Sequence, residues 1–116
     1  MTIQRFDTGP RMSKAVVNGN TVYLAGIVAD APKGKSMGEQ TKSILSQIDG
    51  FLAQAGTDKS KLLSANIWIT DMVKFAEMNA VWDAWVSPGN TPARATVEAK
   101  LASPDYVVEI MVVAAK

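Results

Sequence analysis

The sequence predicts a single α+β domain over residues 1–116, in which two helices cover one face of a mixed β-sheet. Alternating or β-branched segments at both ends of the chain are typical of strands. Two central segments have apolar residues at helical spacing, with polar residues on the opposite side. Neither an internal repeat nor a linker separates these segments. The predicted order is therefore hairpin, helix, strand, helix, hairpin.

The first third of the chain predicts strands. Residues 3–6 are a candidate for a short edge strand. Residues 15–17 and 21–25 flank Asn18-Gly19-Asn20, and Asn-Gly tolerates the positive φ of tight primed turns, so a β-hairpin is expected here. Gly26 follows its second strand. A glycine at this point either lets a ligand approach the backbone closely or marks a bulge or strand end.

The first helix is expected to begin after Ser36, which forms a capping-box pattern with Glu39. Its apolar stripe continues to residue 55, and Gly56 stands at the position where helices commonly end. Residues 63–70 then alternate as a strand does.

The second helix is expected after Asp71, a good N-cap residue, and Ser87-Pro-Gly-Asn90 ends it. Asn79 falls on its apolar side. This amide is either hydrogen-bonded to a neighbouring backbone group or part of a pocket. Trp82 and Trp85 are interpreted as packing residues, since large aromatic side chains at helical spacing usually belong to a core.

The C-terminal segments 91–101 and 106–114 both predict strands, and the turn residues between them predict an antiparallel hairpin. Glu109 lies in the middle of the second strand, among apolar residues. Burying its charge is costly unless it is paired or hydrogen-bonded. Arg94, at the mouth of the predicted hairpin, is the expected partner. The two form either a structural ion pair or a site where Arg94 binds an anion beside Glu109.

The last strand is apolar on both sides, yet two helices can cover only one face of a sheet. Val107, Met111 and Val113 fall on one side, while Val108 and Ile110 fall on the other. The second face therefore needs another partner. A homo-oligomer that packs sheets together would supply it.

Composition excludes several kinds of chemistry. The chain has no cysteine and no histidine, so thiol nucleophiles, Ser-His triads, disulfides and imidazole bases are impossible. The net charge is +1 with no block of like charge, which argues against nucleic-acid or anionic-membrane binding. We see no set of carboxylates with metal-ligand spacing, no signal peptide and no membrane-spanning run, so a cytoplasmic location is expected.

Several motifs together resemble one family over essentially the full chain. The main ones are Pro92-Ala-Arg94-Ala-Thr-Val-Glu98 and, fifteen positions after Arg94, Val107-Val-Glu109-Ile. Supporting motifs are Ser13-Lys-Ala-Val16, Tyr23-Leu-Ala-Gly26 and Met78-Asn79-Ala80 with Phe75. These residues resemble a divergent branch of the RidA/YjgF family of reactive imine deaminases.

The resemblance implies a homotrimer of chorismate-mutase-like subunits (bacillus type), with a central barrel of sheets, helices outside and three pockets at the subunit interfaces. It implies hydrolysis of 2-imino or 2-enamino acids to 2-keto acids and ammonia, without a cofactor or metal. Arg94 would bind the substrate carboxylate, and Glu109 would orient or activate water. Backbone groups near Gly26 and Thr96 would complete the cradle, and Asn79 is included among the binding residues.

The chain departs from the best-known branch of that family at several site positions. Met12 stands where that branch has tyrosine, Ile27 where it has glutamine, and Thr96 where it has cysteine. Met12 and Ile27 would make the pocket more apolar, which favours the alternative of a non-catalytic trimeric protein that senses a small carboxylate. A ribonuclease, also ascribed to this family, is disfavoured by the near-neutral charge and the lack of histidine. The physiological substrate is left open.

Overall fold

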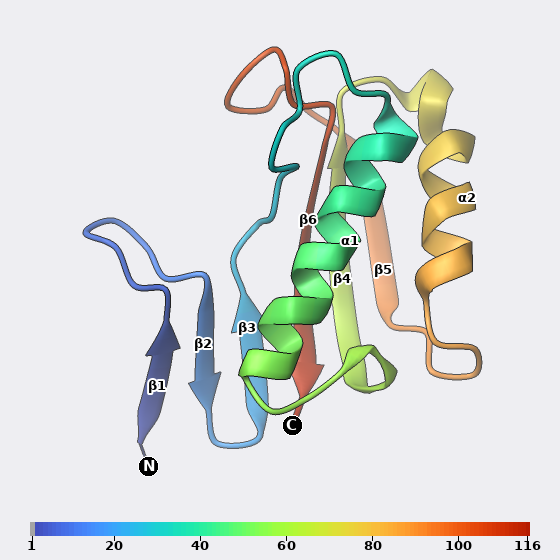
Figure 1. Cartoon of the computed structure of the whole chain (residues 1–116). Helices are drawn as coiled ribbons and strands as arrows, with labels where there is room; N and C mark the ends of the chain where they lie inside the picture. Colours follow the sequence, from blue (N-terminus) through green and yellow to red (C-terminus); the bar gives the residue numbers. More distant parts are fainter. Residues whose placement is uncertain (1) are drawn as a thin grey trace.

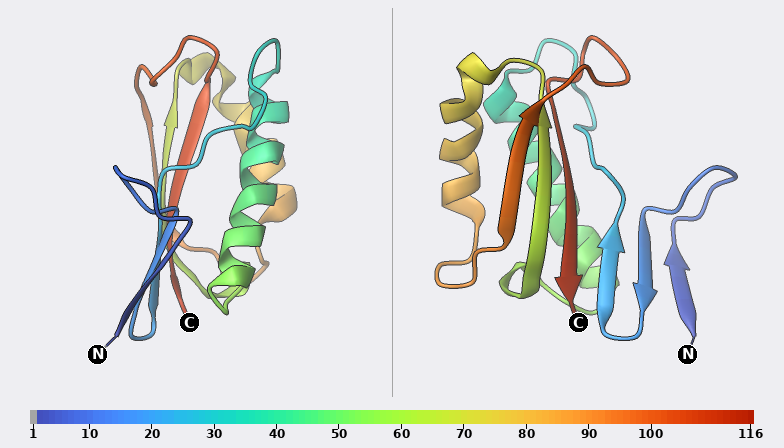
Figure 2. Two further views of the ribbon diagram at one scale, coloured as in Figure 1. Left: turned by 60° about the vertical axis from the view of Figure 1, so that its left-hand side comes forward. Right: turned by 180° about the vertical axis from the view of Figure 1, so that it is seen from behind.

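The computed structural model describes residues 2–116 as a six-stranded sheet with two helices on one face (Figures 1 and 2). The strand order is β1-β2-β3-β6-β4-β5. The predicted fold class is confirmed. Elements in chain order are β1 (Ile3–Phe6), β2 (Ala15–Asn18), β3 (Thr21–Leu24), α1 (Met37–Gln54), η1 (Lys59–Lys61), β4 (Leu62–Ile69), η2 (Met72–Lys74), α2 (Phe75–Trp85), β5 (Ala93–Glu98) and β6 (Val108–Ala115).

The predicted hairpin between the two C-terminal strands is wrong. β5 pairs with β4 in parallel, and β6 pairs with the other side of β4 in antiparallel orientation. The segment between them crosses the end of β4, where Ala99 N donates to Ile69 O at 3.0 Å and Thr70 N donates to Val107 O at 3.1 Å. This arrangement gives β6, the most apolar strand, neighbours on both sides and leaves the more polar β5 at the edge.

The predicted hairpin of β2 and β3 is confirmed. Asn18 pairs with Thr21, so Gly19 and Asn20 form a two-residue turn. Gly19 has φ 61°. A glycine at the first central position is the signature of a type II′ turn, whose twist matches that of the flanking strands.

The predicted ends of the first helix are also found, whereas the predicted start of the second is not. Ser36 Oγ accepts from Glu39 N at 3.1 Å, while Glu39 accepts from Ser36 N at 3.2 Å, so both halves of the capping box are present. These hydrogen bonds from Ser36 hold the pKa of Glu39 below its usual value. Gly56, with φ 85°, follows α1. Asp71 caps the short η2 turn rather than α2 itself, which begins at Phe75.

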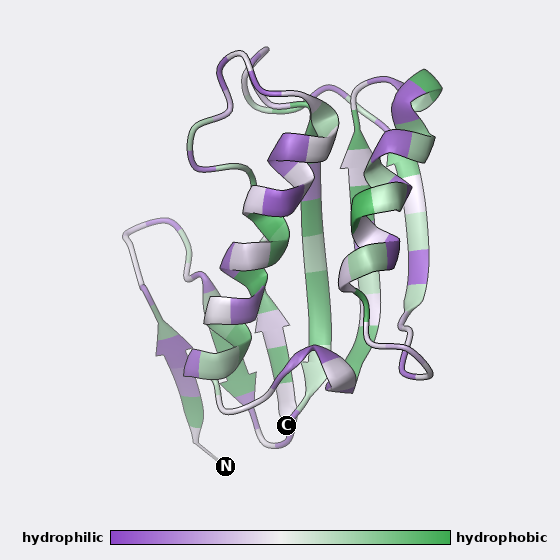
Figure 3. Ribbon diagram, turned by 45° about the vertical axis from the view of Figure 1, so that its right-hand side comes forward, coloured by the Kyte–Doolittle hydropathy of each residue, from purple (hydrophilic) through white to green (hydrophobic). Residues whose placement is uncertain are grey.

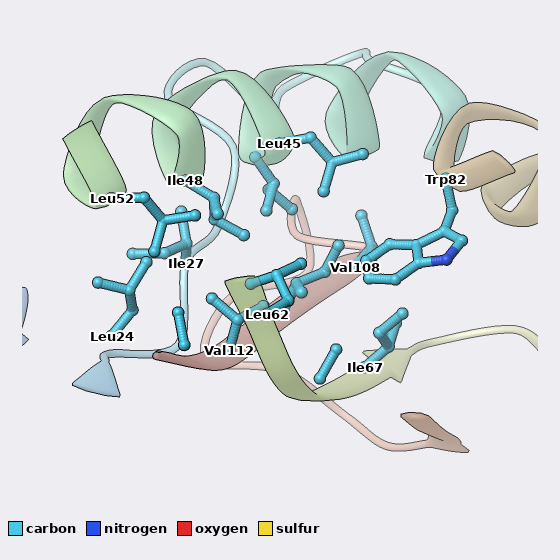
Figure 4. Close-up of a cluster of buried hydrophobic side chains, with 14 of the residues drawn as sticks. Leu24, Ile27, Leu45, Ile48, Leu52, Leu62, Ile67, Trp82, Val108 and Val112 are labelled. Atoms are coloured by element: carbon cyan, nitrogen blue, oxygen red, sulfur yellow. The ribbon is translucent and has the colours of Figure 1, made fainter. Parts of the chain in front are cut away.

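The hydrophobic core fills the space between the helices and the sheet (Figure 4). Along β6, Val108, Ile110 and Val112 point into it and are fully buried. Burial of one such side chain stabilises a fold by about 1.5–3 kcal/mol. Every second residue of β6 thus packs under the helices α1 and α2.

The other face of the sheet carries no helix in the described part of the chain, as Figure 2 shows edge-on. We call it the open face. Its apolar residues include Tyr23, 46% exposed, which pairs with Val113, and Val97, 49% exposed, which pairs with Trp68. The uncovered apolar face predicted from β6 is therefore present, and an oligomer that covers it stays a prediction. Within residues 2–116, neither helix is long and apolar enough to cross a membrane.

Candidate functional site

Arg94 and Glu109 lie on opposite faces of the sheet. Arg94 is in register with Ala65, which is buried under the helices, so both side chains share the helix-facing side. Glu109 stands between the buried Val108 and Ile110 and therefore points to the open face. The expected pairing of Arg94 with Glu109 within one chain is wrong, because β4 separates their strands and their side chains diverge.

Arg94 is held against two aromatic rings of α2. Its Cζ lies 5.8 Å from the ring centre of Phe75 and 5.4 Å from that of Trp82. A guanidinium over an aromatic face is attracted by the ring quadrupole, and it keeps its in-plane N–H groups for other partners. Arg94 is exposed on the edge strand. It can therefore present that fork to an anion from outside the subunit.

Among residues 2–116, two polar atoms on the elements that hold Arg94 and its aromatic rings are buried without a partner. They are Asn79 Oδ1 and Thr96 Oγ1. Asn79 lies one turn after Phe75 on α2, and Thr96 is in register with the buried Ile67, on the same face of β5 as Arg94. Unsatisfied buried acceptors are uncommon in native proteins, so they mark a place where a donor is missing. We call Phe75, Asn79, Trp82, Arg94 and Thr96 the arginine cluster.

Glu109 occupies space that Gly26 leaves free. A Cβ on Gly26 would clash with Glu109 Oε2 and lie 3.1 Å from its Cδ. Gly26 thus permits a close approach, as one interpretation of the sequence held, but the approaching group is the Glu109 carboxylate. Across the sheet, Glu109 is in register with Trp68. Glu109 is half-buried, and its carboxylate lies against the backbone of Gly26.

The two remaining predicted residues lie elsewhere. Ile27 is 1% exposed in the core, and its backbone bridges to Ile110 through hydrogen bonds of 2.8 and 3.1 Å. This placement does not support the prediction that Ile27 lines a pocket, because its side chain packs in the core of the single chain. Met12 is 48% exposed in the loop between β1 and β2, where its carbonyl accepts from Gly9 N at 2.8 Å.

Sequence reasoning missed the partners of the two charged residues. Trp82 was interpreted as a packing residue, and it does pack in the core, but its ring also supports Arg94. Trp68, in register with Glu109 on β4, is not among the predicted site residues. The seven-residue spacing of Phe75 and Trp82 was a usable signal, because it puts both rings on one face of a helix. Within residues 2–116, no group of three or more acidic side chains is arranged to hold a metal ion.

Fold and site together define a class of protein: a small α+β domain with a six-stranded mixed sheet, an aromatic-backed arginine at its edge and a glutamate on its open face. The family model described as Endoribonuclease L-PSP matches residues 2–116. The chain belongs to this family, which is also called the YjgF/RidA family.

Relatives of known sequence and structure agree with this assignment. A RutC family protein of Haemophilus influenzae is 44% identical over 114 residues, covering 98% of both chains. The RutC family protein YoaB of Escherichia coli K12 is 44% identical over 115 residues, covering 99% of both. A crystal structure of a YjgF-family protein from Neisseria meningitidis superposes with a TM-score of 0.96 at 49% identity, covering 100% of this chain and 96% of the other.

Proposed function

We propose that the protein is a cofactor-independent deaminase that hydrolyses 2-imino and 2-enamino acids to 2-keto acids and ammonia. Arg94 binds the substrate carboxylate, and Glu109 orients or activates the attacking water. The observation that carries the proposal is the exposed Arg94, whose guanidinium lies over the rings of Phe75 and Trp82, together with the buried, unpartnered oxygens of Asn79 and Thr96 on the same two elements.

The arginine cluster suits a 2-imino acid at both ends of the reacting group. A carboxylate matches two parallel N–H groups of Arg94, whose guanidinium lies over the rings of Phe75 and Trp82. The imine or enamine nitrogen carries N–H donors. These donors suit Asn79 Oδ1 or Thr96 Oγ1, which have no hydrogen-bond partner among the described residues.

Glu109 must come from a neighbouring subunit. Within one chain it lies on the face opposite Arg94, so no ligand of the size of an amino acid contacts both. A second copy that packs on the uncovered open face can bring its edge strand β5, with Arg94, to the first copy's Glu109. This arrangement supports the proposed homotrimer with one pocket at each interface, because it covers the apolar face and joins the two charges.

The chemistry then needs only positioning and one proton-handling group. The imine carbon is electrophilic, so a water oxygen adds to it while Glu109 accepts a water proton. That proton passes to the imine nitrogen, which gives a carbinolamine. The hydroxyl proton then moves by way of Glu109 to the same nitrogen, so the C–N bond breaks with release of ammonia and the C–O bond becomes the ketone. Substrate plus water thus gives keto acid plus ammonia.

A non-catalytic sensor of small carboxylates is the second candidate. It is favoured by the separation of the two charges, because Arg94 can bind an acid within one subunit without Glu109. Ile27 no longer supports it, since its side chain is in the core. RNA cleavage, suggested by the family description, is disfavoured by the net charge of +1 and the lack of histidine.

The test is ammonia release from imino acids generated in situ by an amino-acid oxidase. We expect the wild type to accelerate release, Arg94→Ala to abolish the acceleration, and Arg94→Lys to restore only part of it, because lysine lacks the bidentate fork. A protein that binds keto acids but leaves the rate unchanged for small, branched and aromatic substrates would be a sensor instead.

A further inference from the structure

A groove of about 570 Å³ runs between α1 and α2, on the side of the helices away from the arginine cluster. Figure 3 shows the two helices side by side. Its walls include Ala80 and Ala84 from α2 and Leu45 from α1. The small alanine side chains leave an apolar slot there. The groove shares none of its lining with Phe75, Asn79 or Trp82, which face β5.

Hydrogen bonds join the two helices at two points. Gly38 N at the start of α1 donates to Glu77 Oε1 of α2 at 2.8 Å. Toward the other end of α2, Trp85 Nε1 donates to both carboxylate oxygens of Asp49, at 3.1 and 3.0 Å. A wall tied at two points is organised before a ligand arrives, so binding costs less ordering.

The charges in the groove favour an anion. Lys42 and Lys59 both line it, and the Lys59 ammonium lies 5.2 Å above the Trp85 ring centre. Among residues 2–116 the one ion pair joins Lys35 and Glu39, so neither lysine of the groove is in an ion pair. The carboxylate of Asp49, also in the lining, already accepts from the Trp85 indole.

We infer that this groove binds a small amphipathic organic acid, with a flat apolar body in the slot and its carboxylate at the lysines. An apolar body matches the walls formed by Leu45, Ala80 and Ala84, and a single negative charge matches the excess of cations. The volume suits a molecule of ligand size. A docked protein would need a much larger surface than this slot offers. The inference does not depend on the proposed deaminase activity.

The probe for this site is 2-naphthoate, and its uncharged control is 2-naphthamide, which has nearly the same shape. Both are titrated into the full-length protein while backbone amide shifts are followed by NMR. We expect saturable binding of 2-naphthoate with shifts confined to α1, α2 and η1. The affinity for the amide should be lower by about tenfold or more, because the amide lacks the charge that the lysines recognise.

Two variants at an exposed groove position sharpen the test. Ala84→Glu places a negative charge in the slot, whereas Ala84→Gln adds the same bulk without it, and both residues favour a helix. We expect Ala84→Glu to bind 2-naphthoate about tenfold more weakly than Ala84→Gln, because like charges repel and the new carboxylate competes for the lysines. Circular dichroism of both variants checks that the helices remain.

Three results would overturn the inference. One is the absence of saturable 2-naphthoate binding by the wild type. Another is equal affinity for acid and amide, which would remove the role of the lysines. The third is loss of binding in Arg94→Ala, which would place the acid at the arginine cluster. Unchanged binding in that variant is expected, and it separates this groove from the proposed deaminase site.

Discussion

On one side of β6, Val108, Ile110 and Val112 have no solvent exposure, whereas Glu109, Met111 and Val113 on the other side remain half-buried. The first set is covered by helices of the same chain. The second set is just as apolar apart from Glu109, but nothing in the described chain covers it. One face of this strand is therefore buried by folding of the single chain, and the other face has the apolar composition typical of an interface between subunits.

The two charged residues of the site follow the same division. Arg94 is supported by aromatic rings on the side that folding completes, while Glu109 stands on the side that it leaves uncovered. If the functional pocket needs both, then folding alone does not make it. The predictions below test this division.

The largest expected effect is on activity. Arg94→Ala and Glu109→Gln should each lower kcat/KM for a 2-imino acid by about a hundredfold or more, since each removes a charged contact made in the transition state. Ammonia release by the separate variants gives the measurement.

Mixing the two inactive variants separates an intersubunit site from an intrachain one. After joint unfolding and refolding, about three quarters of random trimers contain both variants, and each such ring holds one intact site, so about a quarter of wild-type activity should return. Mixtures that stay inactive would place the site within one chain and contradict the proposed assembly.

Gly26→Ala should disturb Glu109 without touching Arg94. The added methyl would clash with Glu109 Oε2, which forces the carboxylate from its place. We expect kcat/KM to fall about tenfold or more through mispositioning. KM should change less than kcat, because the carboxylate anchor Arg94 is intact. If Gly26→Ala retains full activity, then the position of Glu109 in this structure is not the one that acts.

The valines of β6 allow a matched test of the two faces. Val112→Ala should lower the free energy of unfolding by about 2 kcal/mol at any protein concentration, because it leaves a cavity in the core. Val113→Ala should lower the free energy of unfolding of the protomer by less. Its effect should increase at protein concentrations where the subunits associate. Urea unfolding at several protein concentrations measures both. Equal, concentration-independent losses would mean that the open face is not an interface.

The smallest expected effect concerns the unpartnered Thr96 hydroxyl. Thr96→Val removes a buried acceptor without a donor while nearly keeping its shape, so stability should be unchanged or rise by up to about 1 kcal/mol. Thermal unfolding measures this change. If kcat/KM falls in the same variant, the hydroxyl contacts substrate; Thr96→Ser, which keeps the hydroxyl, is the control.

Local signals in the sequence predicted local structure well. The Ser36–Glu39 capping box, the end of α1 before Gly56 and the β2–β3 turn all depend on residues within a few positions of one another. The β5–β6 pairing failed for the opposite reason. Turn residues at 102–105 indicate that the chain reverses, but not whether a third strand lies between the two arms.

The site was predicted only in part, because its residues come from strands that are far apart in the sequence. Residue types identified Arg94 and Glu109 as the charged groups that needed an explanation. Alternation along each strand fixes which side a residue faces only after its neighbours are known, so their placement on opposite faces was out of reach. The position of Ile27 in the core likewise depends on its bridge to Ile110, far along the chain.

The contact between Gly26 and Glu109 also gives a rule for reading related chains. The carboxylate takes the volume that a side chain at position 26 would fill, so the residue at position 26 and the glutamate at position 109 have to be considered together. A chain that keeps the glutamate but has a larger residue in place of the glycine must hold that carboxylate elsewhere. Such a chain would have the glutamate in a different position from the one described here. A motif search for the glutamate alone would wrongly group it with chains that have both residues.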